Sequence, residues 1–300
     1  MGGCARLKSA LLIPHTGKEV PYLIHPVEPK KVLCIHDLSG MGRCSLAVIL
    51  PVLSVMGVQP VALPTVVLST HTGGLGTPAR LDGCAYGEQA LEHYHALGVE
   101  FDCIYTGYLG GEDQVALAEK AFALWPAAKK IVDPVMGDNG EVYSSYTPEM
   151  CTRMRELCAI ADLITPNTTE AAILLGRDPA SAPQSEREAE EWMRALYEEY
   201  GASVVLTGLD YEPGRVGSGC LENGELTISL HERIDCYYPG TGDVFAAVML
   251  GALLGGAKLR DACVKAGEFV RDTIAYTAQQ GTDPNFGVQF EKLLPQLWNK

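Results

Sequence analysis

The sequence predicts an α/β fold, with a mostly parallel central sheet flanked by helices and an antiparallel hairpin at a late edge. The parallel part follows from short strands that are apolar throughout and from the longer helical patterns that separate them, beginning at residue 30. The hairpin follows from Glu222-Asn223-Gly224, an Asn-Gly turn signal between two strand-like runs. We therefore expect residues 30–300 to form a single domain, preceded by residues 1–29 as an N-terminal arm or an added extension.

Hydrophobic patterns justify the elements in chain order. The first strand is expected over residues 31–36, followed by a glycine turn and a helix over residues 44–56 that contains Pro51 and stops at Gly57. Further strands are expected over residues 58–63, 103–106, 130–133, 162–165 and 203–206. Further helices are expected over residues 112–125, 148–159, 167–175 and 185–200. The chain closes with the hairpin strands 215–221 and 225–230 and the helices 243–254 and 258–277.

Composition and charge argue against several classes of partner. The chain carries a net charge of −14 and has no cluster of Lys and Arg, which argues against nucleic acid and anionic membrane surfaces. No uninterrupted apolar run reaches about 18 residues, so we expect no transmembrane helix. The ten cysteines are scattered and form no C-x-x-C, which favours a cytoplasmic protein over a disulfide framework or a zinc site.

The most informative motif is Gly240-Thr241-Gly242-Asp243, which opens a strongly apolar helical run. Its glycines let backbone N–H groups approach a ligand at the start of a helix, where an anion is stabilised. Asp243 stands beside that anion site and is placed to take a proton from an incoming hydroxyl. An anion cradle with an adjacent base is the minimum equipment for phosphoryl transfer. The alternative is that Thr241 or Asp243 only caps the helix.

Three polar segments at predicted strand ends offer groups that can bind a flat polar ring. Asp37 and Ser39 follow the first strand, where neighbouring glycines permit close approach of a ligand. His71 and Thr72 lie in an unusually polar segment after an apolar run, and Tyr108 follows another strand and can stack on a ring. Since ligands of such sheets bind beyond the carboxyl ends of the strands, these segments are candidates for a substrate site. The alternatives are a helix cap, a surface loop and a packed core tyrosine.

Three later strand ends carry groups suited to a nucleotide and a metal ion. Asp133 ends a strand just before a proline, a good place for a carboxylate that holds a hydrated magnesium ion near phosphates. Asn167 and Glu170 end another strand and begin a helix, with the spacing of a capping box, which is the structural alternative for this pair. Thr207 and Gly208 end a further buried strand and are placed to contact a nucleotide.

The ordered set of motifs resembles a known family. Asp133-Pro134-Val135-Met136-Gly137-Asp138, Asn167-x-x-Glu170 and Gly240-Thr241-Gly242-Asp243 are similar to those of the ATP-dependent vitamin kinases of the ribokinase superfamily. Ser69-Thr70-His71-Thr72-Gly73 and Thr106-Gly107-Tyr108 resemble its pyridoxal kinase branch, and the likeness covers about residues 31–280. The resemblance implies a three-layer ribokinase-like fold without a large lid, and transfer of the ATP γ-phosphoryl group to the 5′-hydroxymethyl group of pyridoxal, pyridoxamine or pyridoxine. It also implies Mg²⁺, a homodimer and, as an open point, a monovalent cation such as K⁺.

The same resemblance implies a role for each candidate residue. Asp243 would be the base that activates the hydroxyl, and the amides of the preceding three residues would stabilise charge on the transferring group: Gly240, Thr241 and Gly242. Magnesium and its waters would be organised by Asp133 and Glu170. The ATP phosphates would be approached by Asn167, Thr207 and Gly208. The pyridine ring would be held by Asp37, Ser39, His71, Thr72 and Tyr108.

One segment leaves a second substrate open, and two other classes of function are disfavoured. Asp37-Leu38-Ser39-Gly40 is closer to the Asp-Pro-Ser-Gly of the hydroxymethylpyrimidine kinases of thiamine synthesis, whose substrate is also a flat ring with a hydroxymethyl group. His71-Thr72-Gly73 favours the B6 vitamers instead. A non-catalytic vitamer-binding protein is disfavoured because a pure binder needs no base such as Asp243. A Rossmann dehydrogenase is disfavoured because the third glycine of its fingerprint is missing after Gly40-Met41-Gly42.

Overall fold

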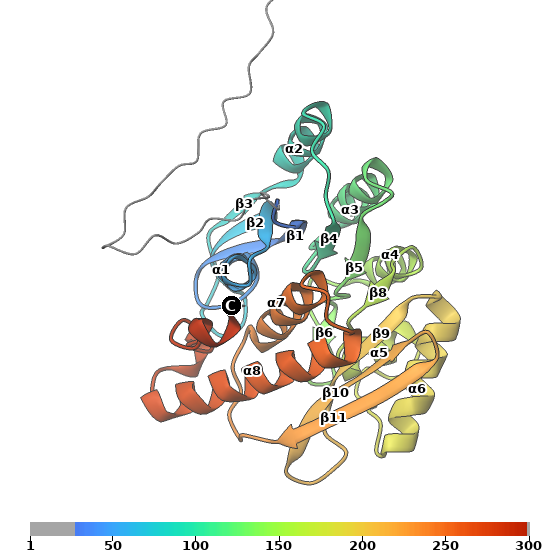
Figure 1. Cartoon of the computed structure of the whole chain (residues 1–300), viewed down its shortest axis with the longest axis vertical. Coiled ribbons are helices and arrows are strands. Elements are labelled where there is room, and N and C mark those ends of the chain that lie inside the picture. The colour runs from blue at the N-terminus through green and yellow to red at the C-terminus, as the bar shows by residue number, and fades with distance from the viewer. Residues whose placement is uncertain (1–27, 299–300) are drawn as a thin grey trace, which may run out of the picture.

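The computed structural model describes residues 28–298, and a nine-stranded sheet runs through this part of the chain (Figure 1). Its strands are β1 (Lys31–Met41), β2 (Gln59–Thr70), β3 (Arg80–Asp82), β4 (Cys103–Thr106), β5 (Lys129–Val132), β8 (Leu163–Ile164), β9 (Ser203–Leu209), β10 (Arg215–Glu222) and β11 (Glu225–Glu232). Their order across the sheet is β11-β10-β9-β8-β5-β4-β1-β2-β3. Residues 1–27 of the predicted arm lie outside the described residues, so the arm stays a prediction.

The direction of the strands confirms the predicted class. The six strands that lie between β10 and β3 in the sheet are parallel to one another. The β10–β11 hairpin is antiparallel at one edge, and the short β3 is antiparallel at the other. Asn223 and Gly224 have positive φ angles of 52° and 83°, as a tight hairpin turn of the Asn-Gly kind requires. The expected late antiparallel hairpin at the edge of a mostly parallel sheet is therefore present.

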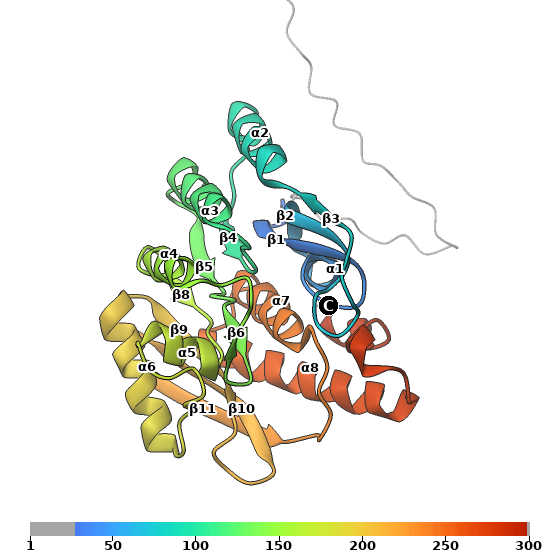
Figure 2. The same ribbon diagram turned by 180° about the vertical axis from the view of Figure 1, so that it is seen from behind.

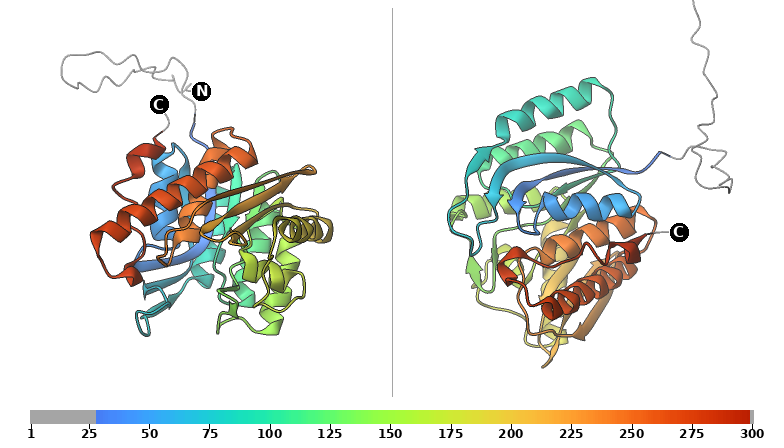
Figure 3. Two further views of the ribbon diagram at one scale, coloured as in Figure 1. Left: turned by 90° about the horizontal axis from the view of Figure 1, so that it is seen from below. Right: turned by 90° about the vertical axis from the view of Figure 1, so that its left-hand side faces the viewer.

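Helices cover both faces of the sheet and give three layers (Figure 2). They are α1 (Leu46–Val55), α2 (Cys84–Ala96), α3 (Glu112–Leu124), α4 (Pro148–Cys158), α5 (Thr168–Leu174), α6 (Glu186–Tyr200), α7 (Thr241–Leu254) and α8 (Leu259–Gln280). The helices α1, α7 and α8 lie together on one face, as the right-hand view of Figure 3 shows, and α2 to α6 cover the other. Among the helices within residues 28–298, none is both long and apolar enough to span a bilayer.

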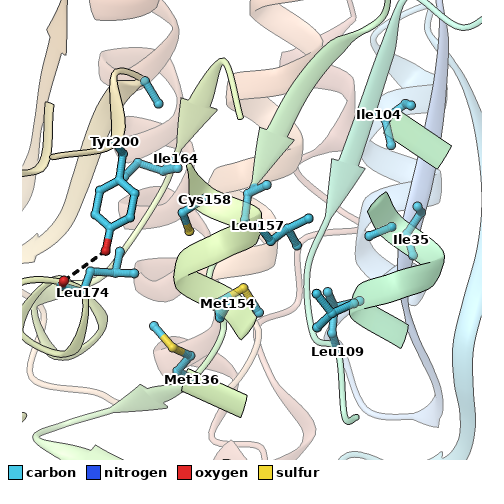
Figure 4. Packing of buried hydrophobic residues seen from close by; sticks show 14 of the residues in the cluster. Ile35, Ile104, Leu109, Met136, Met154, Leu157, Cys158, Ile164, Leu174 and Tyr200 are labelled. Atoms are coloured by element: carbon cyan, nitrogen blue, oxygen red, sulfur yellow. Dashed lines mark hydrogen bonds between the residues drawn. The ribbon is translucent and has the colours of Figure 1, made fainter. Parts of the chain in front are cut away.

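The core lies on both faces of the sheet because successive side chains of a strand point to opposite sides. Leu33 and Ile35 of β1 belong to the cluster that packs against α2 to α6, whereas Val32 and Cys34 belong to the cluster under α1, α7 and α8. Figure 4 shows part of the first cluster. The side chains of these four β1 residues are fully buried. Burial on both faces explains why this part of the strand is a continuous apolar run.

Two predicted strands are too short. The strand β1 continues to Met41 instead of ending at residue 36, and β2 continues to Thr70 instead of residue 63. The two strands stay paired as far as Met41 and Thr70, so the predicted glycine turn after residue 36 is wrong. Polar residues such as Asp37 hid the continuation, because the prediction relied on apolar side chains while the ladder is held by backbone hydrogen bonds.

Several elements were not predicted from the sequence, among them one whole helix. The helix α2 has only a narrow buried face, made of Gly87, Ala90 and Leu91. The hairpin of β6 (Gly137–Asp138) and β7 (Glu141–Val142) turns at Asn139-Gly140 and forms a second, two-stranded sheet. Its turn is an Asn-Gly pair with positive φ angles, the same signal that identified the later hairpin. The strands are too short to show an alternating pattern.

Candidate active site

The predicted anion cradle forms the start of α7, next to the segment between β1 and α1. Gly240 is the N-cap and has a φ angle of 83°. A Cβ atom on Gly240 would lie 1.9 Å from the carbonyl oxygen of Arg43, so only glycine fits. A Cβ atom on Gly242 would meet nothing within 4 Å, so the space beside this residue is open. No side chain caps α7, which contradicts the alternative that Thr241 or Asp243 serves only as a cap and leaves the first helical N–H groups available to an anion.

The carboxylate of Asp243 is held by two hydrogen bonds from outside its own helix. Its Oδ2 accepts a hydrogen bond from the backbone N–H of Ser45 at 2.7 Å, and its Oδ1 lies 3.1 Å from Nε2 of His36. Ser45 has a φ angle of 56°, an uncommon conformation for a residue with a side chain. The Asp243 side chain is 15% exposed, so the carboxylate is fixed in place yet reachable by a ligand.

His36 is a site residue that the sequence reasoning missed. Its ring is buried, with 3% of the side chain exposed, and it lies between two acids: Nε2 faces Asp243 and Nδ1 lies 2.9 Å from Oδ1 of Asp37. Burial opposes the charged ring, but the hydrogen bonds to Asp243 and Asp37 outweigh it and raise the pKa of His36 to about 10. The available signal was a histidine directly before an acid at the end of a buried strand.

The predicted ring-binding residues of β1 contact each other. Asp37 and Ser39 are both buried, and the Ser39 hydroxyl donates a hydrogen bond to Oδ2 of Asp37 at 3.0 Å. Burial opposes ionisation of Asp37, but the hydrogen bond and charge of His36 outweigh it and hold the pKa of this carboxyl below its usual range. The structure thus joins both residues to His36 and Asp243 in one network.

The other three predicted ring-binding residues lie in different surroundings. His71 is buried and is bound by backbone groups: Nε2 lies 2.6 Å from the carbonyl oxygen of Asn285, and Nδ1 accepts the N–H of Gly73 at 3.1 Å. Thr72 is exposed. Tyr108 is half-buried, donates its hydroxyl hydrogen to Ser145 at 3.0 Å and contacts the ring of Tyr146 edge-on. Thr72 and Tyr108 remain accessible to a ligand, whereas His71 holds the loop after β2 against the C-terminal segment.

The two predicted magnesium residues carry electrostatically linked carboxylates. Burial and then the charge of Asp243 raise the pKa of Asp133 to about 7, and the Tyr105 hydroxyl donates a hydrogen bond to Asp133 at 3.1 Å. Burial and then the charge of Asp133 raise the pKa of Glu170 well above its usual range. Because nearby acids disfavour each other's charge, a cation placed between them would be stabilised.

Asn167 and Glu170 form the capping box that was the structural alternative. The Asn167 side chain accepts the N–H of Glu170 at 2.9 Å, and Glu170 accepts the N–H of Asn167 at 2.8 Å. The other Glu170 oxygen accepts the N–H of Met136 at 3.2 Å. Thr207 pairs with Asn167 in an isolated bridge, and Gly208 is exposed with a φ angle of 74°. Asn167 and Thr207 are therefore neighbours, but Thr207 and Gly208 do not end their strand as predicted, because β9 continues to Leu209.

The chain is similar to known kinases. The phosphomethylpyrimidine kinase family matches residues 50–287. A pyridoxine/pyridoxal/pyridoxamine kinase of Bordetella avium is 29% identical over 82% of the chain and 85% of its own length.

Two solved structures share the fold over nearly the whole chain. The pyridoxal kinase of Lactobacillus plantarum is 33% identical and covers 91% of this chain and 97% of its own, with a TM-score of 0.82. A Bacteroides thetaiotaomicron protein described as a phosphomethylpyrimidine kinase was solved with pyridoxal. It is 36% identical and covers 90% of this chain and 96% of its own, with a TM-score of 0.84.

Proposed function

Since the chain belongs to the phosphomethylpyrimidine kinase family and is an ATP-dependent phosphotransferase with an alcohol acceptor, we propose that its acceptor is the 5′-hydroxymethyl group of a B6 vitamer. The observation that carries the proposal is the position of Asp243, held at the start of α7 beside an open, glycine-lined first turn. Asp243 would take the proton as the O–H bond of the alcohol breaks. The alcohol oxygen then bonds to the γ-phosphorus, and the bond from phosphorus to the ADP oxygen breaks.

The amides of Gly240, Thr241 and Gly242 would stabilise charge on the transferring phosphoryl group. Two facts support this role: the first turn of α7 has no capping side chain, and the space beside Gly242 is open. Helix N-termini of this kind attract phosphate because their N–H groups are unpaired and their dipole is positive. The rest of the triphosphate would be approached by three neighbouring residues, Asn167, Thr207 and Gly208.

Magnesium would be held at Asp133 and Glu170, where it neutralises charge on ATP when bound. The donor set fits, since both groups are carboxylates in a region that raises their pKa values. Among residues 28–298, no three His, Cys, Asp or Glu side chains are grouped to hold a metal on their own. We therefore propose that phosphate oxygens and water complete the magnesium shell. A monovalent cation such as K⁺ stays an open part of the proposal.

The vitamer ring would be contacted by Thr72 and Tyr108, the accessible members of the predicted set. The same site would be shaped by three residues that line it from within the protein, because each is buried and hydrogen-bonded: Asp37, Ser39 and His71. Incubating the protein with ATP, magnesium and each B6 vitamer tests the proposal. We expect ADP release and the matching 5′-phosphate, whereas a protein that forms no product with any of the three vitamers contradicts it.

A hydroxymethylpyrimidine kinase is the second candidate, supported by the matched family and by the Asp37-Leu38-Ser39-Gly40 segment. Both substrates are flat heteroaromatic rings that bear a hydroxymethyl group. Measuring kcat/KM for the pyrimidine beside that for pyridoxal separates the two functions. A large preference for the pyrimidine would replace the B6 proposal while leaving the phosphoryl-transfer site unchanged.

Replacing Asp37 with serine is expected to change the preference between the two rings. The carboxylate is linked to the base through His36 and accepts a hydrogen bond from Ser39, so its loss alters the polar groups around the site. The measurement is the ratio of kcat/KM for pyridoxal to that for the pyrimidine. The ratio is the useful readout because a general loss of catalysis lowers both values equally. An unchanged ratio would remove Asp37 from the specificity role.

The assembly and the compartment also stay proposals. We propose a homodimer, and the edge strand β3 offers a surface for it, since Leu81 is 68% exposed and Tyr86, nearby in α2, is 53% exposed. We propose a cytoplasmic location because the nine cysteines within residues 28–298 are all free. We also propose that residues 30–300 form a single kinase domain.

A further inference from the structure

His36 has no part in the proposed transfer, yet it contacts the proposed base. Its Nε2 lies 3.1 Å from Asp243, and its Nδ1 lies 2.9 Å from Asp37. The ring thus joins the end of β1 to the first turn of α7. Its nearly complete burial means that these contacts hold the ring without competition from water.

The surroundings of the ring favour its doubly protonated form. Besides Asp37 on its own strand, it is faced by Asp243 from α7, by the ring of Tyr105 from β4 with 6.2 Å between ring centroids, and by the charge of Asp133 directly after β5. The backbone N–H of Asp37 is also 2.9 Å from Nδ1. If Nδ1 were unprotonated and accepted that N–H, its lone pair would also face the negatively charged Asp37 carboxylate, which is unfavourable. A protonated Nδ1 instead donates to the carboxylate, and Nε2–H donates to Asp243.

The fold leaves space for this ring at one particular glycine. A Cβ atom on Gly107 would lie 1.9 Å from Cδ2 of His36 and 2.1 Å from Nε2. Any other residue at position 107 would push the ring away from Asp243. Gly107, in the Thr106-Gly107-Tyr108 segment, is therefore needed to place His36 beside the base Asp243, and not for a contact with the vitamer.

We propose that His36 is a positioning residue for phosphoryl transfer: as an imidazolium held by Asp37, it fixes the orientation of the Asp243 carboxylate. The inference rests on the proposed function, because it needs Asp243 to be the base. The imidazolium donates to Oδ1 of Asp243 and the N–H of Ser45 donates to Oδ2. Each oxygen therefore keeps one lone pair free for the incoming hydroxyl. Asp37 then acts through His36, in addition to any effect on the ring of the substrate.

The test compares His36→Gln with His36→Asn. Glutamine can place a neutral N–H near the position of Nε2, whereas asparagine reaches only the position of Nδ1. We expect kcat to fall about 10- to 100-fold in His36→Gln and further in His36→Asn, with KM for ATP and for the alcohol within about twofold of the parent. His93→Gln, on the exposed side of α2, is the matched control and should match the parent.

A merely structural histidine would not lower kcat selectively while leaving both KM values near those of the parent. Unchanged kcat in both variants, or a rise in KM without a fall in kcat, would overturn the proposal. Nitrogen NMR of the parent's histidine rings gives a readout that needs neither folded variants nor a substrate. We expect His36 to be doubly protonated at pH 8, where an ordinary imidazole is neutral, and a neutral His36 ring would overturn the proposal.

These readouts separate the two hypotheses. If the parent phosphorylates the pyrimidine and not the vitamers, the variants are compared on the pyrimidine, and the role of His36 is judged there. If the parent phosphorylates no alcohol, the proposed function fails and the catalytic role of His36 fails with it, while the NMR result still decides the charge of the ring.

Discussion

Replacing Asp243 with asparagine should lower kcat by roughly two to four orders of magnitude, the usual contribution of a positioned base. The amide has nearly the same shape as the carboxylate but cannot take the proton of the alcohol. Binding of ATP should change little, because the amides at the start of α7 are retained. Steady-state turnover with ATP titrations and a direct ATP-binding measurement check both parts.

The geometry adds a second expectation for the same variant. Two donors converge on Asp243, the N–H of Ser45 and Nε2 of His36, and an asparagine can accept from only one of them through its single oxygen. The variant should therefore also lose about 1–3 kcal/mol of unfolding free energy, as expected for an unsatisfied buried donor. Asp261→Asn, at a surface ion pair with Arg260, is the control for loss of a charge. Near-normal turnover in Asp243→Asn would show that Asp243 is not the base.

The large features of the fold could be predicted because they rest on repeated signals. The central parallel strands β1 and β4 are buried on both faces, so they appear as apolar runs, and the late hairpin carries an Asn-Gly turn. The start of α7 could be predicted because Gly240 and Gly242 stand directly before an apolar helix. Here the two glycines turn out to differ, since only Gly240 is required by the backbone.

The role of His36 could not be predicted from a pattern of alternating side chains. In a regular strand His36 and Asp37 would point to opposite faces, which would separate them. The β1–β2 register shifts between His36 and Leu38, and such bulges re-aim side chains beside active sites. As a result, two consecutive polar residues are both buried and in contact. The partner Asp243 is 207 residues away in the sequence, so no local signal could join them.

Replacing Gly240 with alanine should have the largest effect on stability, and Gly242→Ala should have almost none. At Gly240 the alanine must adopt a left-handed conformation, which costs about 1–2 kcal/mol, and its Cβ would overlap the carbonyl of Arg43. Relieving that overlap adds about 1–3 kcal/mol, the usual cost of overpacking. Gly57→Ala isolates the first cost, because Gly57 has a φ angle of 81° but open space around its Cα. Denaturant unfolding of the three variants measures the difference.

The activities of the same variants should follow a different order from their stabilities. Moving the Arg43–Cys44 backbone away from α7 also moves the N–H of Ser45 away from Asp243, so Gly240→Ala should lose turnover as well as stability. Gly242→Ala should keep the parent's stability within about 0.5 kcal/mol but raise KM for ATP, since its methyl group would occupy the open space where the terminal phosphate is proposed to lie. Parental KM for ATP in Gly242→Ala would place the phosphate elsewhere, because a phosphate seated on these amides leaves no room for that methyl group.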